Sequence, residues 1–109
     1  MGFFWLPAFL RPLQRSASRQ QQVEQECHQL ALYHMSACGY CLRVRRVIWR
    51  LNLPIELRNA AHAEPWGREL VEQGGKRQVP CLQIRHPDHT EWLYESDDII
   101  SYLKVRFSR

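Results

Sequence analysis

Two cysteines separated by two residues lie in the stretch SACGYCLRVRR, residues 36–46. Such a CxxC pair can exchange disulfides, supply half of a metal site, or consist of two ordinary small residues. Because a run with helical periodicity follows at once, we expect Cys38 at the start of a helix and Cys41 one turn inside it. The unpaired N–H groups and the positive dipole end at a helix start favour an anion, so we expect Cys38 to be partly thiolate near neutral pH.

That geometry suits nucleophilic attack by Cys38 and resolution by the more shielded Cys41. Three arginines follow within the same predicted helix, and their charges could strengthen the field at the thiolate: Arg43, Arg45 and Arg46.

The composition of the chain limits the class of protein in which this CxxC pair could act. A chain of 109 residues with 45% hydrophobic and 24% charged residues fits one folded domain. The formal net charge is +4, but basic and acidic residues alternate without an aromatic platform, so we expect no nucleic-acid partner. Cys27 and Cys81 have no close cysteine neighbour, which argues against an all-cysteine zinc site, and we expect no metal.

We expect an N-terminal arm and linker over residues 1–28 and a folded domain over residues 29–109. The arm begins apolar and turns basic at Arg11, but it is too short and too interrupted by proline to span a bilayer. Two interpretations stay open: an arm that packs on its own domain or is disordered, or a peripheral membrane contact through residues 1–15. Residues 16–27 predict a polar linker or a short solvated helix. A CxxC without a convincing secretion signal favours a reducing compartment, so we expect a cytoplasmic protein.

From Gln29 onward, short apolar segments typical of strands alternate with segments whose apolar residues have helical spacing. The pattern predicts strands over 29–35, 55–59, 79–85 and 91–95, and helices over 39–51, 64–75 and 98–107, with Ser96 or Asp97 as the last N-cap. A right-handed crossover would make the first two strands parallel. The sequence therefore predicts an α/β fold in which helices flank both faces of a four-stranded mixed sheet.

Pro80 enters the third strand and cannot donate to its ladder, so we expect it at an edge or a turn and as a candidate for a cis bond. Such a kink would leave the N–H and C=O of Val79 free to pair with an extended peptide.

Three segments in this order, LYHMSACGYC, GKRQVP and YESDD, resemble the glutaredoxins of the thioredoxin-like superfamily over about residues 30–107. The resemblance implies a thioredoxin-like (glutaredoxin) fold and a glutathione-dependent thiol-disulfide oxidoreductase. It also implies that Cys38 is the nucleophile, Cys41 the resolving thiol, and the two together the redox-active disulfide. YESDDIISYL is similar as well to the glutathione-contacting segment of glutathione transferase N-terminal domains, although we expect no room for the transferase's second domain.

The resemblance further implies how glutathione, the co-substrate, would be held. Val79 would pair with its cysteinyl main chain, while Ser96 and Asp97 would hold its γ-glutamyl end. Arg77 would meet the glycyl carboxylate. The remaining predicted contact residues are Tyr40, Gln78, Pro80 and Glu95. The partners implied are glutathione and either protein disulfides or glutathionylated proteins, and we expect a monomer.

Departures from the family pattern leave alternatives open. Met35 stands where many glutaredoxins have lysine, Tyr94 and Glu95 replace the usual Gly-Gly, and CGYC replaces the commoner CPYC. CGYC also occurs in mycoredoxins, which use another low-molecular-weight thiol. Some glutaredoxins without the motif proline bridge a [2Fe-2S] cluster between two subunits, so an iron–sulfur carrier that uses Cys38 and glutathione is an alternative. Another is a membrane-tethered adaptor with a vestigial redox pair. We expect Cys81 in the core and Cys27 as a spare thiol that precedes the fold.

Overall fold

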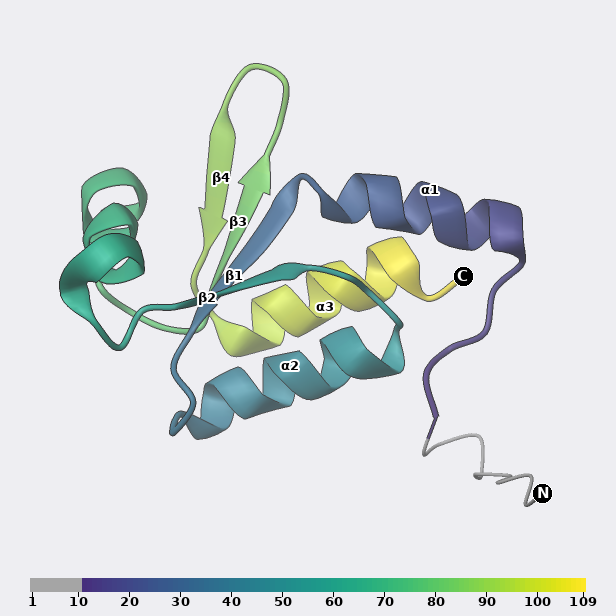
Figure 1. Ribbon diagram of the computed structural model, residues 1–109, viewed down its shortest axis with the longest axis horizontal. Helices are drawn as coiled ribbons and strands as arrows, with labels where there is room; N and C mark the ends of the chain where they lie inside the picture. The colour runs from purple at the N-terminus through teal and green to yellow at the C-terminus, as the bar shows by residue number, and fades with distance from the viewer. Residues whose placement is uncertain (1–10) are drawn as a thin grey trace.

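One sheet with a hydrophobic layer on each face organises residues 11–109, the part of the chain that the computed structural model describes (Figure 1). In chain order the elements are α1 (Ala17–Cys27), β1 (Leu30–His34), α2 (Gly39–Arg50), β2 (Glu56–Asn59), the π-helical segments η2 (Ala63–Gly67) and η3 (Leu70–Gly74), β3 (Cys81–Arg85), β4 (Thr90–Leu93) and α3 (Ser96–Phe107).

The sheet has the strand order β2-β1-β3-β4. β1 pairs in parallel with β2 and antiparallel with β3, so that Leu32 lies opposite Leu57 on one side and Leu82 on the other. β3 and β4 form an antiparallel hairpin. The predicted mixed sheet with a parallel first pair is therefore confirmed.

Alternation along β1 divides the interior into two layers, because successive side chains of a strand point to opposite faces. Leu30 and Leu32 belong to the larger layer, and Tyr33 belongs to the smaller one. The larger layer is built with α1, α2 and α3, and the smaller one with the η2–η3 segment, as the view in Figure 1 shows. Helices on both faces of the sheet are confirmed.

α2 is fixed to this sheet by one apolar side. Val44 and Ile48 are buried in the larger layer, whereas Arg46 and Arg50 are exposed. The helix ends where Asn52 takes a left-handed backbone conformation with φ of 56°, two residues before Pro54, as the sequence predicts. The start of α2 is thus held in a defined position above the sheet.

α1 corrects the expectation of a polar linker or a solvated helix. A helix forms, with the Ser16 side chain accepting the Arg19 N–H at 3.2 Å, but Val23 and Cys27 are 0% and 1% exposed in the larger layer. Cys27 is therefore a core residue and not a spare thiol outside the fold, and burial raises its pKa to about 11. Two apolar side chains four positions apart give too weak a periodicity to show this from sequence.

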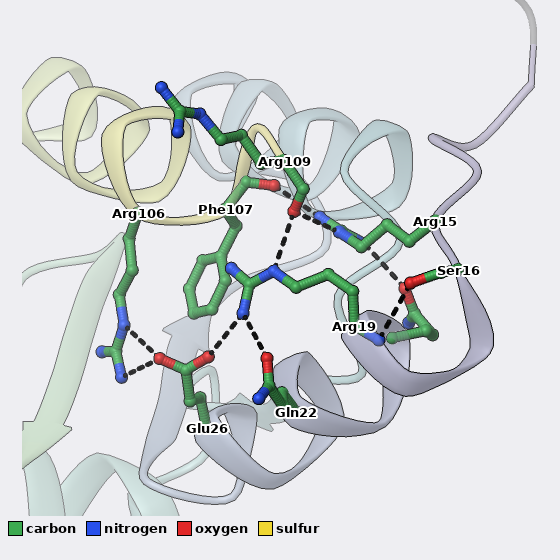
Figure 2. Close-up of polar contacts among 9 residues, drawn as sticks. Arg15, Ser16, Arg19, Gln22, Glu26, Arg106, Phe107 and Arg109 are labelled. Atoms are coloured by element: carbon green, nitrogen blue, oxygen red, sulfur yellow. Dashed lines mark hydrogen bonds and ion pairs between the residues drawn. The ribbon is translucent and has the colours of Figure 1, made fainter.

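Polar contacts attach α1 to the C-terminal end of α3 (Figure 2). Arg15 donates to the main-chain carbonyls of Phe107 and Arg109, and Arg19 donates to that of Arg109 at 3.3 Å. Glu26 pairs with Arg19 at 3.4 Å and with Arg106 at 3.1 Å. Guanidinium groups at these carbonyls meet the negative end of the helix dipole, which favours them there.

Two helix starts differ from expectation. Glu64 is extended, with φ of −110° and ψ of 137°, because the residue before a proline avoids helical angles, so it does not belong to the helix predicted over 64–75. The rest of that helix consists of the two π-helical segments joined by Arg68 and Glu69, which are α-helical. It ends at Gly75, which has φ of 97°. The N-cap of α3 is Glu95 and not Ser96 or Asp97, because the Glu95 carbonyl already accepts the Ile99 N–H at 2.9 Å.

The membrane-contact hypothesis falls mainly on residues 1–10, which lie outside the described residues. Within residues 11–109, no helix has the length and hydropathy needed to cross a bilayer.

Replacing Val23 with alanine tests the packing of α1. Val23→Ala should lower the free energy of unfolding by about 1–3 kcal/mol, because it removes buried carbon atoms and leaves a cavity. Val105→Ala in α3 is the matched control: Val105 is 84% exposed, so the change should stay within about 0.5 kcal/mol. Urea unfolding followed by circular dichroism measures both, and equal effects would contradict the assigned packing.

Candidate functional site

The two cysteines of the CxxC motif occupy different environments at the start of α2. Cys38 is the N-cap residue and is partly exposed, and its Sγ accepts the Cys41 N–H at 3.3 Å. Cys41 is 0% exposed, one turn inside the helix. Both thiols are free. This is the arrangement that the spacing predicts, with an accessible sulfur in front of a shielded one.

Electrostatics separate the two thiols further. Burial by itself would raise the pKa of Cys38, but hydrogen bonds from the Cys41 thiol and from the N–H groups of Cys41 and Tyr40 outweigh it, and the net pKa is lowered. These donors are the unpaired groups of a helix start, which stabilise an anion. The pKa of Cys41 is instead raised to about 11, first by burial and then by its hydrogen bond to Cys38. The thiolate therefore forms on Cys38.

Arg45 adds a positive charge beneath the pair. It lies one turn beyond Cys41 on α2, and its charge helps to lower the pKa of Cys38 and opposes part of the rise in the pKa of Cys41. Burial, followed by the charge of Arg45, also lowers the pKa of His34 at the end of β1. Arg45 Nε and His34 Nδ1 are both buried without a hydrogen-bond partner among the described residues. Arg45 thus supplies a cation near the thiolate although Met35 takes the place of the usual lysine.

A groove of about 250 Å³ lies at the start of α2. It is lined by Tyr40, Arg43, Gln78, Val79, Pro80, Tyr94, Glu95, Ser96 and Asp97. The structure thus brings together every predicted glutathione-contact residue except Arg77. A larger hollow of about 490 Å³ lies near the opposite end of α2, between residues 11–14 and Arg50, away from both motif cysteines.

Arg77 is held elsewhere. Its guanidinium donates to the main-chain carbonyls of Ala60 at 3.2 Å and Ala61 at 2.9 Å, in the loop after β2. Both acceptors are main-chain groups, which a sequence pattern does not reveal.

The middle of the groove is main chain. The Val79–Pro80 bond is cis, as the sequence predicts. Among the described residues, neither the N–H nor the C=O of Val79 is hydrogen-bonded, so a peptide could pair with both. The neighbouring Cys81 is 0% exposed and its pKa is raised to about 12, mainly by burial. Cys81 is a core residue, as predicted, and not a second nucleophile.

Sequence reasoning missed two residues of the lining, Arg43 and Tyr94. Arg43 is three residues after Tyr40, which places both on one side of α2, so helical spacing could have found it. Tyr94 is positioned by tertiary packing, since its hydroxyl donates to the Lys76 carbonyl at 3.1 Å and lies against Gly74, where an added Cβ would clash with it. Within residues 11–109, no three His, Cys, Asp or Glu side chains gather where they could hold a metal ion.

Comparisons with known proteins agree with this architecture. The family model described as glutathione S-transferase, N-terminal domain, matches residues 32–109. The chain therefore belongs to the family of glutathione S-transferase N-terminal domains, whose thioredoxin-like fold the glutaredoxins share. The similarity to transferases extends well beyond the YESDDIISYL segment in which the sequence analysis noted it.

Individual relatives point the same way. Glutaredoxin 2 of Escherichia coli (strain K12) is 31% identical over 74 residues, which cover 68% of this chain and 32% of that protein. Maleylacetoacetate isomerase of Anaeromyxobacter dehalogenans 2CP-1, solved with dicarboxyethyl glutathione and citrate in the active site, superposes with a TM-score of 0.58 at 25% identity, over 74% of this chain and 38% of that one. Wheat glutaredoxin superposes with a TM-score of 0.52 at 20% identity over 81% and 84% of the two chains, which shows a shared fold. This chain spans about a third of the length of the curated glutaredoxins that it matches.

Replacing Arg45 tests the electrostatic assignment. Arg45→Met should raise the pKa of Cys38, because the thiolate loses a stabilising cation while the helix start stays intact. The rate of Cys38 alkylation by iodoacetamide, followed against pH in a Cys27→Ala, Cys81→Ala background, reports this pKa. Arg46→Met removes the same charge from the exposed side of α2 and should leave the profile in place. Coincident profiles for all three proteins would contradict the role of Arg45.

Proposed function

We propose that this protein is a glutathione-dependent thiol-disulfide oxidoreductase that reduces protein disulfides and glutathione mixed disulfides. The observation that carries the proposal is the asymmetry of the pair: a partly exposed Cys38 with a lowered pKa beside a groove, and a buried Cys41 with a pKa raised to about 11. A nucleophile in front of a shielded resolving thiol is what disulfide exchange requires.

With a glutathionylated protein, the Cys38 thiolate attacks the glutathione sulfur. A Cys38–glutathione disulfide forms, the original disulfide breaks, and the protein thiolate leaves and takes a proton from water. A second glutathione thiolate then attacks the glutathione sulfur of this adduct, which releases glutathione disulfide and restores the Cys38 thiolate. Overall, the sulfur of the entering glutathione is oxidised from thiol to disulfide, the protein sulfur is reduced from disulfide to thiol, and the first glutathione stays at the disulfide level.

With a protein disulfide, Cys38 forms a mixed disulfide with the substrate, and Cys41 then attacks Cys38 Sγ. The products are a reduced dithiol substrate and a Cys38–Cys41 disulfide, which two glutathiones reduce in turn. Interaction with Cys38 is one cause of the raised pKa of Cys41. Once Cys38 is part of a disulfide, that cause is removed, so Cys41 ionises more readily at the step that needs it.

The groove supports a binding mode for glutathione. The cysteinyl main chain pairs with Val79 beside Pro80, the γ-glutamyl end lies at Ser96 and Asp97, and Tyr40 lines the groove. Gln78 and Glu95 complete the lining. Arg77 is left out of this proposed set, because its guanidinium is committed to the loop after β2. The glutathione derivative bound by the similar isomerase supports a glutathione site on this fold.

The remaining assignments belong to the same proposal. The protein acts as a monomer in the reducing cytoplasm, where glutathione keeps its thiols reduced. Residues 29–109 carry the activity. A separate hypothesis, made from the composition of residues 1–15, is that these residues provide a peripheral membrane contact. Lipid association of the whole chain and of a chain without residues 1–15 tests that hypothesis.

Two measurements distinguish the alternatives. An iron–sulfur carrier purified without oxygen absorbs visible light through its cluster, whereas a dithiol protein is colourless. A mycoredoxin-like protein turns over with another low-molecular-weight thiol and not with glutathione, which a steady-state comparison of thiols detects.

Serine substitutions separate the roles of the two cysteines. Cys38→Ser should abolish turnover of every disulfide, because no other described thiol has a lowered pKa. Cys41→Ser should keep glutathione removal from a small mixed disulfide and lose reduction of a protein disulfide, since only the latter needs a resolving thiol. Cys81→Ala is the control that removes a buried thiol. If Cys41→Ser is as inactive as Cys38→Ser toward the small mixed disulfide, the division of roles is wrong.

A further inference from the structure

Arg43 bridges the two helix starts that border the groove. From the first turn of α2, one of its terminal nitrogens pairs with Asp97 Oδ1 at 2.8 Å, and the other donates to Ser96 Oγ at 3.5 Å. Asp97 and Ser96 belong to the first turn of α3. The guanidinium therefore lies at the end of the groove that the proposed function gives to the γ-glutamyl group.

The position of Arg43 differs from the rest of the groove lining in its charge. Among the described residues that line the groove, Arg43 is the only cation, whereas Glu95 and Asp97 are acidic. Asp98 adds a third carboxylate to the same helix start. A ligand carboxylate that approaches this end would therefore meet acidic side chains of like charge, and Arg43 is the lining group that can offset them.

The ion pair between Arg43 and Asp97 is weak enough for contacts with a charged ligand to replace it. The Arg43 and Asp97 side chains are 50% and 82% exposed, so water screens their attraction and the pair holds weakly. An amino-acid head group carries an ammonium and a carboxylate on one carbon atom. Its ammonium can pair with Asp97 and its carboxylate can pair with Arg43. The ligand then replaces the Arg43–Asp97 pair, and each side chain keeps a partner of opposite charge.

We propose that Arg43 is a specificity-determining residue, which receives the α-carboxylate of the γ-glutamyl group and so selects thiols that carry a free amino-acid head. This inference rests on the proposed use of glutathione. In the free protein, the guanidinium lies at this end of the groove in its weak pair with Asp97. In the complex, Arg43 and Asp97 recognise the two charges of the head group separately, and a thiol without that head group leaves them paired.

The test compares glutathione with cysteinylglycine, which has the same thiol and glycyl end but no γ-glutamyl group. With a small mixed disulfide as the other substrate, Arg43→Gln should lower kcat/KM for glutathione about five- to tenfold, the effect of one charge-assisted contact at a partly exposed site. It should leave kcat/KM for cysteinylglycine and the pH profile of Cys38 alkylation unchanged. Arg46→Gln, the same change at an exposed position of α2, should stay within about twofold of the unsubstituted protein with both thiols.

Other outcomes overturn the inference in recognisable ways. An equal fall with both thiols would show a general effect on the thiolate, and a rise with glutathione would show that Arg43 blocks Asp97. Absence of glutathione turnover by the unsubstituted protein would refute the proposed function itself, before any variant is compared.

Discussion

The proposed chemistry depends on one interaction, the stabilisation of an anionic Cys38 sulfur where α2 begins. The charge is stabilised by main-chain N–H groups and by the Cys41 thiol, all belonging to the first turn of the helix. These donors are useful only while the helix start is fixed, and the burial of Val44 and Ile48 against the sheet fixes it. The hydrophobic core thus acts on the chemistry by holding a helix end in place, and the charge of Arg45 adds to the stabilisation of the anion.

The same first turn of α2 also borders the groove, so reactivity and recognition are built on one element. Tyr40 and, one turn on, Arg43 line the groove, whereas Cys41 is buried. The other borders come from the main chain before β3 and from the start of α3. Because β3 runs antiparallel to β1 and β4 runs antiparallel to β3, the end of β1, the start of β3 and the end of β4 lie at one end of the sheet, where the three segments meet. A ligand there contacts parts of the chain that are far apart in sequence.

Features with a local cause could be predicted from the sequence. Several predicted features depend only on residues near one another in the chain, and the structure contains them all. They are the strands β1 and β3, the helix α2, its end at Asn52 and the cis bond before Pro80. The positions of Cys38 and Cys41 follow in the same way, from where α2 begins. Most residues of the groove lining could be predicted through the resemblance to glutaredoxins, because the thioredoxin-like order of elements fixes which loops meet.

The remaining features have non-local causes. Val23 and Cys27 are buried because α1 is attached through Arg15 and Arg19 to the far end of α3, and the sequence of α1 alone gives no sign of this. Arg77 donates to carbonyl groups of another loop and does not line the groove, although its position in the chain predicts a cation there. Arg43 enters the lining through a contact between two helices. The charge of the groove is therefore decided by tertiary contacts even where its shape follows from the fold, and recognition can differ between chains that share this architecture.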